Sequence, residues 1–600
     1  ETRITTKESW EKIYPETEEA FRLREDDRSH PGSGVWRGEF WGKYILSAIA
    51  ACRYYSSKEL KARIRKAVDG LISTQDENGY IGTYTDSSKY GDNTWNIWCR
   101  KYTLWGLMEA WELLKNDKIL KAASAMADHL MSEVGPGKDD IIQTGNFYGM
   151  PSTSILTPVI KLYRATENKD YLEYGKYIVK QWSEHPEGLP DLLNKSLSGE
   201  AVHKWFPETE EWAKSYEMIS CMEGLLELYR ETDKEDYLQA VKNFYKLILE
   251  WEEFPVGSVS FNDKFVGSSN FINIVSEICD SVYWNRLSYQ LFLLTKEPSY
   301  LDVIEKTLYN ALLCGMKPDG SWGLRRFRFS HGHIPAHKHF LENHHCCVDN
   351  LPRALFQAAE STVFTDKSGL YLGLYNAGTG KIKTPEDNNL EIDIKGDFFD
   401  EGQVSIELSL EKAEEFNLSF RMPGWSRVTK VIINDQEKTG TPGVWLTVNR
   451  EWQSGDKIKV IFDMATKVEL FEPQLPADDK NIKWHEKKWA QMSYLGEENI
   501  IMTEVDINDL LPHRRAVMYC RGPLVLAKDI RLGSKDIFEP LPVDLDYMNP
   551  VDIEKVKAPE AIWKSYQLKF ETGETLDLCD FGSAGNTWDE QSLFNLWNII

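Results

Sequence analysis

Apolar residues recur at helical spacing through the first 360 residues, in runs that are broken by short polar turns. Five of these breaks share one pattern, in which the polar turn is followed by a leucine that opens the next helical run. The five leucines are Leu60, Leu120, Leu172, Leu238 and Leu301. They lie 52 to 66 residues apart, which indicates a loose repeat of helical hairpins. A sixth unit that begins at Cys346 would close a ring of six.

The pattern changes near residue 362, where apolar and polar residues begin to alternate. Segments such as 369–378 and 456–464 follow this period of two and are separated by turn residues, which predicts antiparallel strands in a β-sandwich. We expect the strand-like pieces of residues 465–600 to complete the sandwich region, as one or two subdomains. The predicted fold is therefore mainly α plus β, with an (α/α)6 toroid over residues 1–361 and a C-terminal antiparallel β-sandwich region over residues 362–600.

Composition narrows the range of partners. The 600 residues include 70 basic and 94 acidic side chains, and the net charge of −24 has the wrong sign for binding a phosphate backbone, so we expect no nucleic-acid partner. No apolar run approaches the roughly 18 residues that indicate a membrane span. Aromatic residues make up 12% of the chain, and 21 of them are Trp. Aromatic rings stack on sugars, but they also fill wide helical cores, and composition leaves both interpretations open.

The strongest candidate for chemistry is a set of one carboxylate and three thiols, Glu277, Cys279, Cys346 and Cys347. Such a set is a plausible tetrahedral site for zinc, which accepts both sulfur and oxygen. Residues i and i+2 point about 200° apart on a helix, so Glu277 and Cys279 can converge only at a helix start or in a loop. The alternative is that the cysteines are small buried hydrophobes. We expect that role for the other six, Cys52, Cys99, Cys221, Cys314, Cys520 and Cys579.

The Glu-x-Cys pair and the later Cys-Cys-x-x-Asn-x-x-Arg stretch resemble a motif of glycoside hydrolase family 127, the β-L-arabinofuranosidase family. In the second stretch the matching residues are Cys346, Cys347, Asn350 and Arg353. Segments 75–84, 418–425 and 521–527 are similar to further parts of that family. The resemblance implies a retaining enzyme in which a zinc-bound cysteine thiolate attacks the sugar. By position, Cys346 would be the nucleophile, and Glu277, Cys279 and Cys347 would be the other zinc ligands.

The sequence departs from the family pattern at the acid/base residue. The family's glutamate lies on a Gly-Glu-x-Phe-like segment upstream of the Glu-x-Cys pair, and the nearest match here is Asn-Asp-Lys-Phe, with Asp263 in place of glutamate. Glu217 and Glu223 are the alternates for this role. Asp263 could instead be an ordinary turn residue, a common role for an Asn-Asp pair.

Two further groups of residues bear on the substrate. Six of the twelve histidines fall within residues 331–345, and of these we predict substrate contacts only for His344 and His345, which adjoin Cys346. Arg326 and Arg328 would share one face of an alternating strand and could bind a carboxylated sugar bidentately. An ordinary salt-bridged strand would have the same pattern.

We therefore expect an exo-acting retaining glycosidase that uses zinc to release a terminal L-arabinofuranose, or a related furanosidic sugar, from a plant or algal oligosaccharide or polysaccharide. The resemblance also admits other sugars, such as the aceric acid of pectin or 3,6-anhydro-galactose. Two alternatives stay open: a polysaccharide lyase or unsaturated-uronide hydrolase on the same toroid, and a glycan-binding protein with structural zinc. The expected location is periplasmic or secreted, because the role is extracellular and the chain starts at Glu1 rather than Met.

Overall fold

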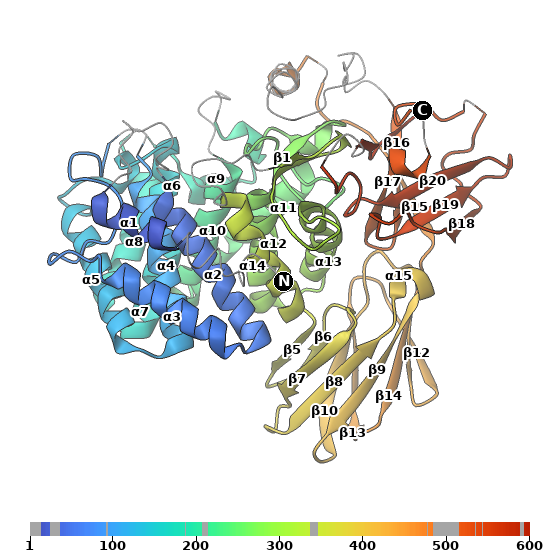
Figure 1. Ribbon diagram of the computed structural model, residues 1–600, viewed down its shortest axis with the longest axis horizontal. Helices are drawn as coiled ribbons and strands as arrows, with labels where there is room; N and C mark the ends of the chain where they lie inside the picture. Colours follow the sequence, from blue (N-terminus) through green and yellow to red (C-terminus); the bar gives the residue numbers. More distant parts are fainter. Residues whose placement is uncertain are drawn as a thin grey trace.

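The protein is described by a computed structural model that covers residues 14–24, 36–91, 94–186, 188–206, 214–335, 346–476, 478–483, 515–533, 536–542, 544–588 and 593–600. Its first part is a double ring of helices, drawn in blue to green in Figure 1. The inner helices are α2 (Arg37–Tyr55), α4 (Asn96–Leu114), α7 (Leu156–Thr166), α10 (Ser215–Thr232), α12 (Ile278–Thr295) and α14 (Cys346–Glu360). Each inner helix packs on the next, and α14 packs on α2, so the ring is closed.

The outer helices confirm the repeat that the leucines predict. They are α1 (Tyr14–Leu23), α3 (Lys58–Ile72), α5 (Asp117–Glu133), α8 (Lys169–Glu184), α11 (Glu235–Trp251) and α13 (Ser299–Thr307). All five leucines lie within the first four residues of the helix that follows its turn. Ser57, Asn116 and Asn168 accept hydrogen bonds from backbone N–H groups of the first turn, so the polar breaks are helix caps. The short helices α6 (Met150–Thr153) and α9 (Leu192–Ser198) lie in connecting segments.

Two sheets that share one core follow the toroid, shown in yellow to orange in Figure 1. A four-stranded sheet has the order β13-β10-β6-β5, and a six-stranded sheet has the order β12-β11-β14-β9-β8-β7. The strands of the first are β5 (Val363–Asp366), β6 (Gly369–Leu372), β10 (Glu414–Arg421) and β13 (Trp445–Trp452). Those of the second are β7 (Gly378–Lys383), β8 (Asn389–Lys395), β9 (Gln403–Leu410), β11 (Thr429–Ile433), β12 (Gln436–Gly440) and β14 (Lys457–Phe462). The predicted sandwich is present, although β6 and β10 pair in parallel.

The strands after residue 465 belong to neither of these two sheets, although some of their buried residues join the same core, and the division of the β region into one or two subdomains stays a prediction. They form a separate sheet, whose main order is β15-β16-β17-β20-β19-β18, and which is red in Figure 1. Its strands are β15 (Thr466–Leu470), β16 (Ala516–Arg521), β17 (Leu524–Asp529), β18 (Asp552–Lys555), β19 (Ser565–Lys569), β20 (Thr575–Asp580), β21 (Phe594–Asn595), β22 (Asn598–Ile599) and β3 (Ser330–His331). Because β3 comes from the helical part and pairs with β21, this sheet is anchored directly on the toroid.

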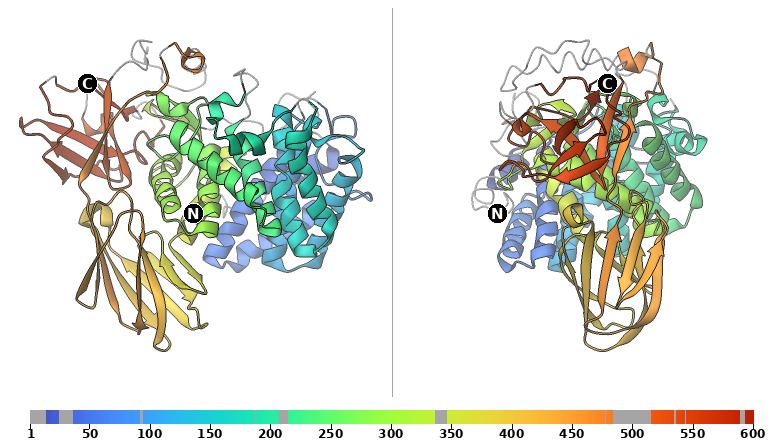
Figure 2. Two further views of the ribbon diagram at one scale, coloured as in Figure 1. Left: turned by 180° about the vertical axis from the view of Figure 1, so that it is seen from behind. Right: turned by 90° about the vertical axis from the view of Figure 1, so that its right-hand side faces the viewer.

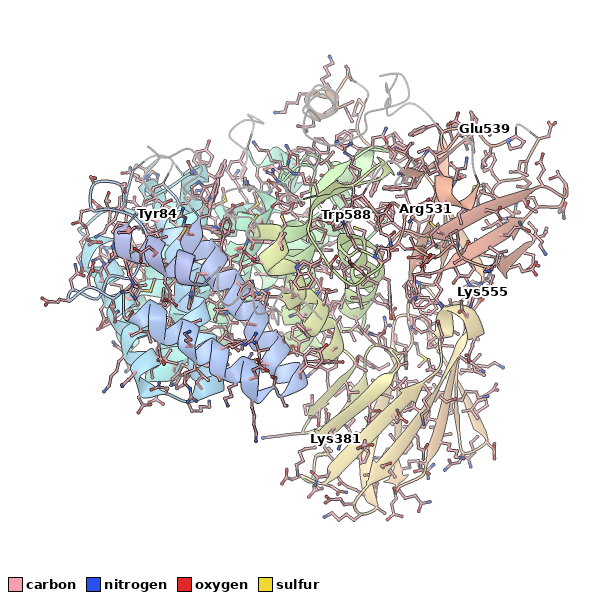
Figure 3. All side chains as sticks on the ribbon, viewed as in Figure 1. Tyr84, Lys381, Arg531, Glu539, Lys555 and Trp588 are labelled. Carbon is pink, nitrogen blue, oxygen red and sulfur yellow. The ribbon has the colours of Figure 1, made fainter. Side chains whose placement is uncertain are left out.

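The two β units stack on one side of the helical ring, as the rear view in Figure 2 shows. Lys555, labelled in Figure 3, lies where they meet, and its Nζ is 2.5 Å from Oδ2 of Asp400 on the short helix α15 (Phe398–Glu401). Helix α14 ends at Glu360 and β5 begins at Val363, whereas the division of the chain into domains at residue 361 stays a prediction. Among the described helices, none is both long and apolar enough to cross a membrane.

Candidate metal centre and catalytic cavity

The four predicted ligands meet where two neighbouring inner helices begin. Glu277 ends strand β1 (Val275–Glu277) and is the N-cap residue of α12, so Cys279 lies in the first turn of that helix. Cys346 and Cys347 are the first two residues of α14, which packs against α12. The structure therefore meets the geometric condition that the i, i+2 spacing imposes, because both pairs occur at helix starts rather than within a helix.

The ligand atoms of these four residues all lie within 4.8 Å of one another. The Cys347 Sγ is 3.0 Å from Glu277 Oε1, and the Cys346 Sγ is 3.5 Å from the same oxygen. The sulfurs of Cys346 and Cys347 are 3.7 Å apart. An ion bound tetrahedrally at about 2.3 Å from each sulfur requires sulfurs roughly 3.8 Å apart, so the donor set and its spacing fit zinc.

Burying the ionised forms of these four residues costs free energy when no cation is bound. Glu277, Cys279 and Cys347 are buried, whereas Cys346 is only partly buried. Burial raises the pKa of Glu277 and the pKa values of the Cys279 and Cys347 thiols well above their usual ranges. A divalent cation bound to these atoms favours their ionised forms and so lowers the same pKa values. The arrangement is therefore one that could hold a metal, and Cys346 is its most accessible sulfur.

A cavity of about 290 Å³ opens onto the cluster, and both Cys346 and Cys279 line it. Its aromatic wall consists of Trp36, Phe40, Trp95, Trp98 and Tyr216. Its charged wall consists of Glu39, Lys43, Lys214, Glu217, Asp263, Glu277, Arg325 and Arg326. Flat apolar faces beside a few polar groups are typical of a sugar-binding pocket.

Asp263 is both a turn residue and a cavity residue. Asn262 and Asp263 have φ values of 47° and 66°, and Phe261 and Lys264 exchange two backbone hydrogen bonds across them, as in a two-residue hairpin. The Asp263 Oδ2 lies 3.3 Å from Lys214 Nζ and 3.9 Å from an Arg326 nitrogen. Although burial raises the pKa of Asp263, Lys214 and Arg326 outweigh it, and the pKa of this carboxyl lies well below its usual range.

The two alternate carboxyls differ in position. Glu217 lines the cavity from α10, and its Oε2 is buried with no hydrogen-bond partner among the described residues. Burial raises the pKa of Glu217 to about 7, against the opposing effect of Lys214. Glu223, on the same helix, is ion-paired with Arg286 and does not line the cavity.

Strand β2 (Leu324–Arg328) carries the arginines, as predicted, in a small sheet with β1 and β4 (Ile334–Pro335). Arg326 lies opposite Glu277 in the register and lines the cavity, whereas Arg328 lies opposite Val275, is buried, and does not line it. Two residues advance a strand by about 6.6 Å, which carries Arg328 past the cavity. Arg325 lines the cavity instead, next to an irregularity in the pairing of β2 with β4. His344 and His345 lie outside the described residues.

Sequence reasoning missed the two lysines of the cavity wall, Lys43 and Lys214. The sequence holds a signal for Lys43, which is the one cation in the largely apolar run 40–52 of α2. The motif residues Asn350 and Arg353 have a supporting place: Arg353 donates to Asn350 Oδ1 at 3.1 Å, and Asn350 Nδ2 lies 3.3 Å from the Tyr216 hydroxyl. The six other cysteines are buried, which agrees with their expected role.

Two family models match this chain. Residues 3–360 match the catalytic domain, and residues 369–464 the middle domain, of the β-L-arabinofuranosidases of glycoside hydrolase family 127. A non-reducing end β-L-arabinofuranosidase of Bifidobacterium longum subsp. longum is 21% identical over 483 residues, which are 71% of this chain and 70% of that protein.

Solved structures show the same fold. A β-arabinofuranosidase of family 127 superposes with a TM-score of 0.69 at 15% identity, over 98% of this chain and 92% of the other. A family 127 β-L-arabinofuranosidase from Geobacillus stearothermophilus T6 superposes with a TM-score of 0.67 at 18% identity, over 99% and 96%. The chain therefore belongs to glycoside hydrolase family 127 and is a glycoside hydrolase that acts on a carbohydrate substrate.

Proposed function

We propose that the enzyme is an exo-acting retaining glycosidase that releases a terminal L-arabinofuranose or a related furanosidic sugar, with Cys346 as nucleophile. The observation that carries this proposal is the position of Cys346, the least buried sulfur of a four-ligand cluster and part of the cavity lining. The names of the relatives, which are β-L-arabinofuranosidases, support the sugar. Family membership also argues against the lyase and the non-catalytic glycan-binding protein.

In this proposal Glu277, Cys279, Cys346 and Cys347 hold zinc. When bound, zinc keeps the thiols ionised at neutral pH, so no separate base is needed to activate the nucleophile. The aromatic wall would orient the sugar ring over Cys346, and the cavity volume of about 290 Å³ suits one terminal sugar residue. We also propose a periplasmic or secreted location, because the polymeric plant or algal glycans that the enzyme would act on lie outside the cell.

A proton donor must serve the leaving oxygen, and two carboxyls compete for that role. Asp263 is our first candidate because it contacts Glu277, which lies 3.5 Å from the Cys346 sulfur. Glu217 is the second candidate because burial raises its pKa to about 7, so that it carries a proton at mildly acidic pH. The contact with Glu277 favours Asp263 as the proton donor, whereas the raised pKa favours Glu217.

Leaving-group chemistry separates these candidates. We expect Asp263→Asn to lose at least about 100-fold in kcat on an alkyl furanoside but far less on a nitrophenyl furanoside, whose leaving group needs little protonation. Glu217→Gln is the matched control and should lower both rates by similar factors. The reverse pattern would assign the proton to Glu217.

A carboxylated furanoside is a second candidate substrate, favoured by Arg325 and Arg326 in the cavity lining. Arg325 lines the cavity, and a guanidinium can donate two parallel hydrogen bonds to a carboxylate. We expect Arg325→Met to lower kcat/KM on a carboxylated furanoside about 10- to 100-fold if that is the substrate. If Arg325→Met changes kcat/KM on the carboxylated furanoside by less than about threefold, neutral L-arabinofuranosides remain the proposed substrates.

The function is tested by assaying nitrophenyl β-L-arabinofuranoside and arabinose-containing oligosaccharides, with the anomer of the first product read by proton NMR. Release of β-L-arabinose with retention would support the proposal. An inverted first product, or full activity of Cys346→Ala on every glycan that the wild type cleaves, would overturn it.

A further inference from the structure

A buried ammonium group lies against the candidate metal centre. Lys43, on the inner helix α2, has no exposed surface, and its Nζ is 3.7 Å from the Cys279 sulfur. The same Nζ lies 2.6 Å from Glu39 Oε1 and 4.4 Å from the centre of the Tyr216 ring. Each of the three N–H donors of the ammonium group can therefore face an acceptor: a carboxylate, a sulfur and an aromatic face.

Stability alone does not account for this arrangement. A fully buried Lys–Glu pair loses about as much in desolvation as it gains in attraction, and apolar residues of the same volume often serve as well. Both residues of the Lys43–Glu39 pair instead line the cavity, and Lys43 also contacts a ligand atom of the cluster. The contact with Cys279 is what a merely structural pair would lack.

Charge explains what the contact does. Three thiolates and one carboxylate around a divalent cation leave a net charge of −2, which a buried site must balance with nearby cations. Arg326 lies 3.8 Å from Glu277 Oε2, and Lys43 lies against Cys279, so the two cations face different ligands. An N–H donor to a thiolate stabilises the negative charge on that sulfur, so the sulfur stays ionised as a ligand while its nucleophilicity falls.

We propose that Lys43 is a positioning residue that holds Cys279 as a non-reacting metal ligand, and so leaves Cys346 as the sulfur that reacts. This inference rests on the proposed function, because it assumes that the cluster binds zinc. It adds a residue outside the ligand set that determines both metal affinity and the choice of nucleophile.

The test compares Lys43→Met with wild type, and Lys101→Met is the matched control. Lys101 is also fully buried on an inner helix; its Nζ lies 4.2 Å from the Trp98 ring centre and has no hydrogen-bond partner among the described residues. Both variants remove one buried ammonium, but only Lys43→Met removes a contact with a cluster sulfur. Zinc affinity is measured by competition with a chromogenic chelator, and alkylation by iodoacetamide is mapped by peptide mass spectrometry.

We expect Lys43→Met to weaken zinc binding about 10- to 100-fold and to spread alkylation from Cys346 to Cys279. In the cobalt-substituted enzyme the sulfur-to-metal charge-transfer band should move to longer wavelength, because the thiolate becomes more electron-rich. Lys101→Met should keep zinc affinity within about threefold of wild type and label Cys346 alone. Lys43→Arg, which keeps a donor, should restore affinity, and it replaces Lys43→Met as the informative variant if the latter does not fold.

Wild-type zinc affinity and labelling at Cys346 alone in Lys43→Met would overturn the inference and leave the proposed function intact. Equal weakening in both lysine variants would also overturn it, since loss of any buried ammonium would then suffice. Failure of the wild type to bind zinc would overturn the proposed mechanism together with the inference.

Discussion

Two of the buried charge clusters among the described residues are built in opposite ways. One joins the toroid to the sandwich: Arg421 of β10 is fully buried and is ion-paired with Asp302 and Glu305, both on α13. Its Nε also donates to the Gly373 carbonyl at 2.6 Å, and Trp425 Nε1 donates to Glu305 at 2.7 Å. A single guanidinium, with donors fixed in a fork, therefore serves several acceptors at once.

The other cluster, Glu277 with the three cysteines, gathers four groups that repel one another when ionised. Lys43 and Arg326 lie nearby, but neither lies between the four ligand atoms. A buried polar cluster whose carboxylates face a guanidinium therefore serves the fold. A cluster with a surplus of anionic donors around a shared centre is instead built for a cation.

Loss of Cys346 should give the largest effect. We expect Cys346→Ala to lower kcat/KM at least about 10⁴-fold, because the nucleophile and one metal ligand are removed together. Cys314→Ala is the matched control, since that thiol is buried elsewhere and contacts the Ala311 carbonyl. Comparable losses in both variants, measured at equal folded fraction, would contradict the assignment.

Removal of the metal should lower the stability that depends on the Glu277 and cysteine cluster and leave the Arg421 cluster unaffected. We expect dialysis against a chelator to lower Tm, and saturating zinc to restore it, because a ligand at 1,000 times its Kd stabilises the folded state by about 4 kcal/mol. Differential scanning fluorimetry of the wild type and of Cys279→Ala measures this, and the variant should not respond to zinc. An equal response in both would mean that zinc acts elsewhere.

The interface cluster should respond to substitution but not to metal. Arg421→Met leaves Glu305 buried and without its guanidinium, and we expect a loss of about 3 to 5 kcal/mol in unfolding free energy. The kcat of the folded fraction should remain within about threefold of wild type, because no residue of this cluster lines the cavity. A variant of wild-type Tm would remove the stabilising role that we assign to Arg421.

A smaller effect is expected from the pH dependence of stability. The pKa of Glu217 rises from 4.5 to about 7 on folding, so its contribution to stability is fully present below pH 4.5 and is lost as the pH rises to 7. The difference is at most about 3 kcal/mol. Between pH 5 and pH 8 the Tm of the wild type should therefore fall further than the Tm of Glu217→Gln. Parallel curves of Tm against pH would show that folding does not raise the pKa of Glu217.

Much of this arrangement could be predicted from the sequence. The polar breaks before Leu60 and its four counterparts fixed the hairpins, since caps and apolar spacing are local features. The cluster was predictable because one carboxylate and three thiols are a donor set that suits zinc and resemble a family motif, and because Glu277 and Cys279 can converge at a helix start or in a loop. The rest depends on contacts between distant segments: Ser330 pairs with Asn595, and nothing local in either segment indicates it. Lys43 was missed for a related reason, because a lone lysine in a helix usually faces solvent.

Diffraction at the zinc absorption edge, from crystals grown with zinc and the enzyme's sugar product, tests the central claim most directly. We expect one anomalous peak about 2.3 Å from the sulfurs of Cys279, Cys346 and Cys347, within reach of Glu277, and the sugar's anomeric carbon beside the Cys346 sulfur. A disulfide between two of these cysteines, or a peak elsewhere in the protein, would contradict it.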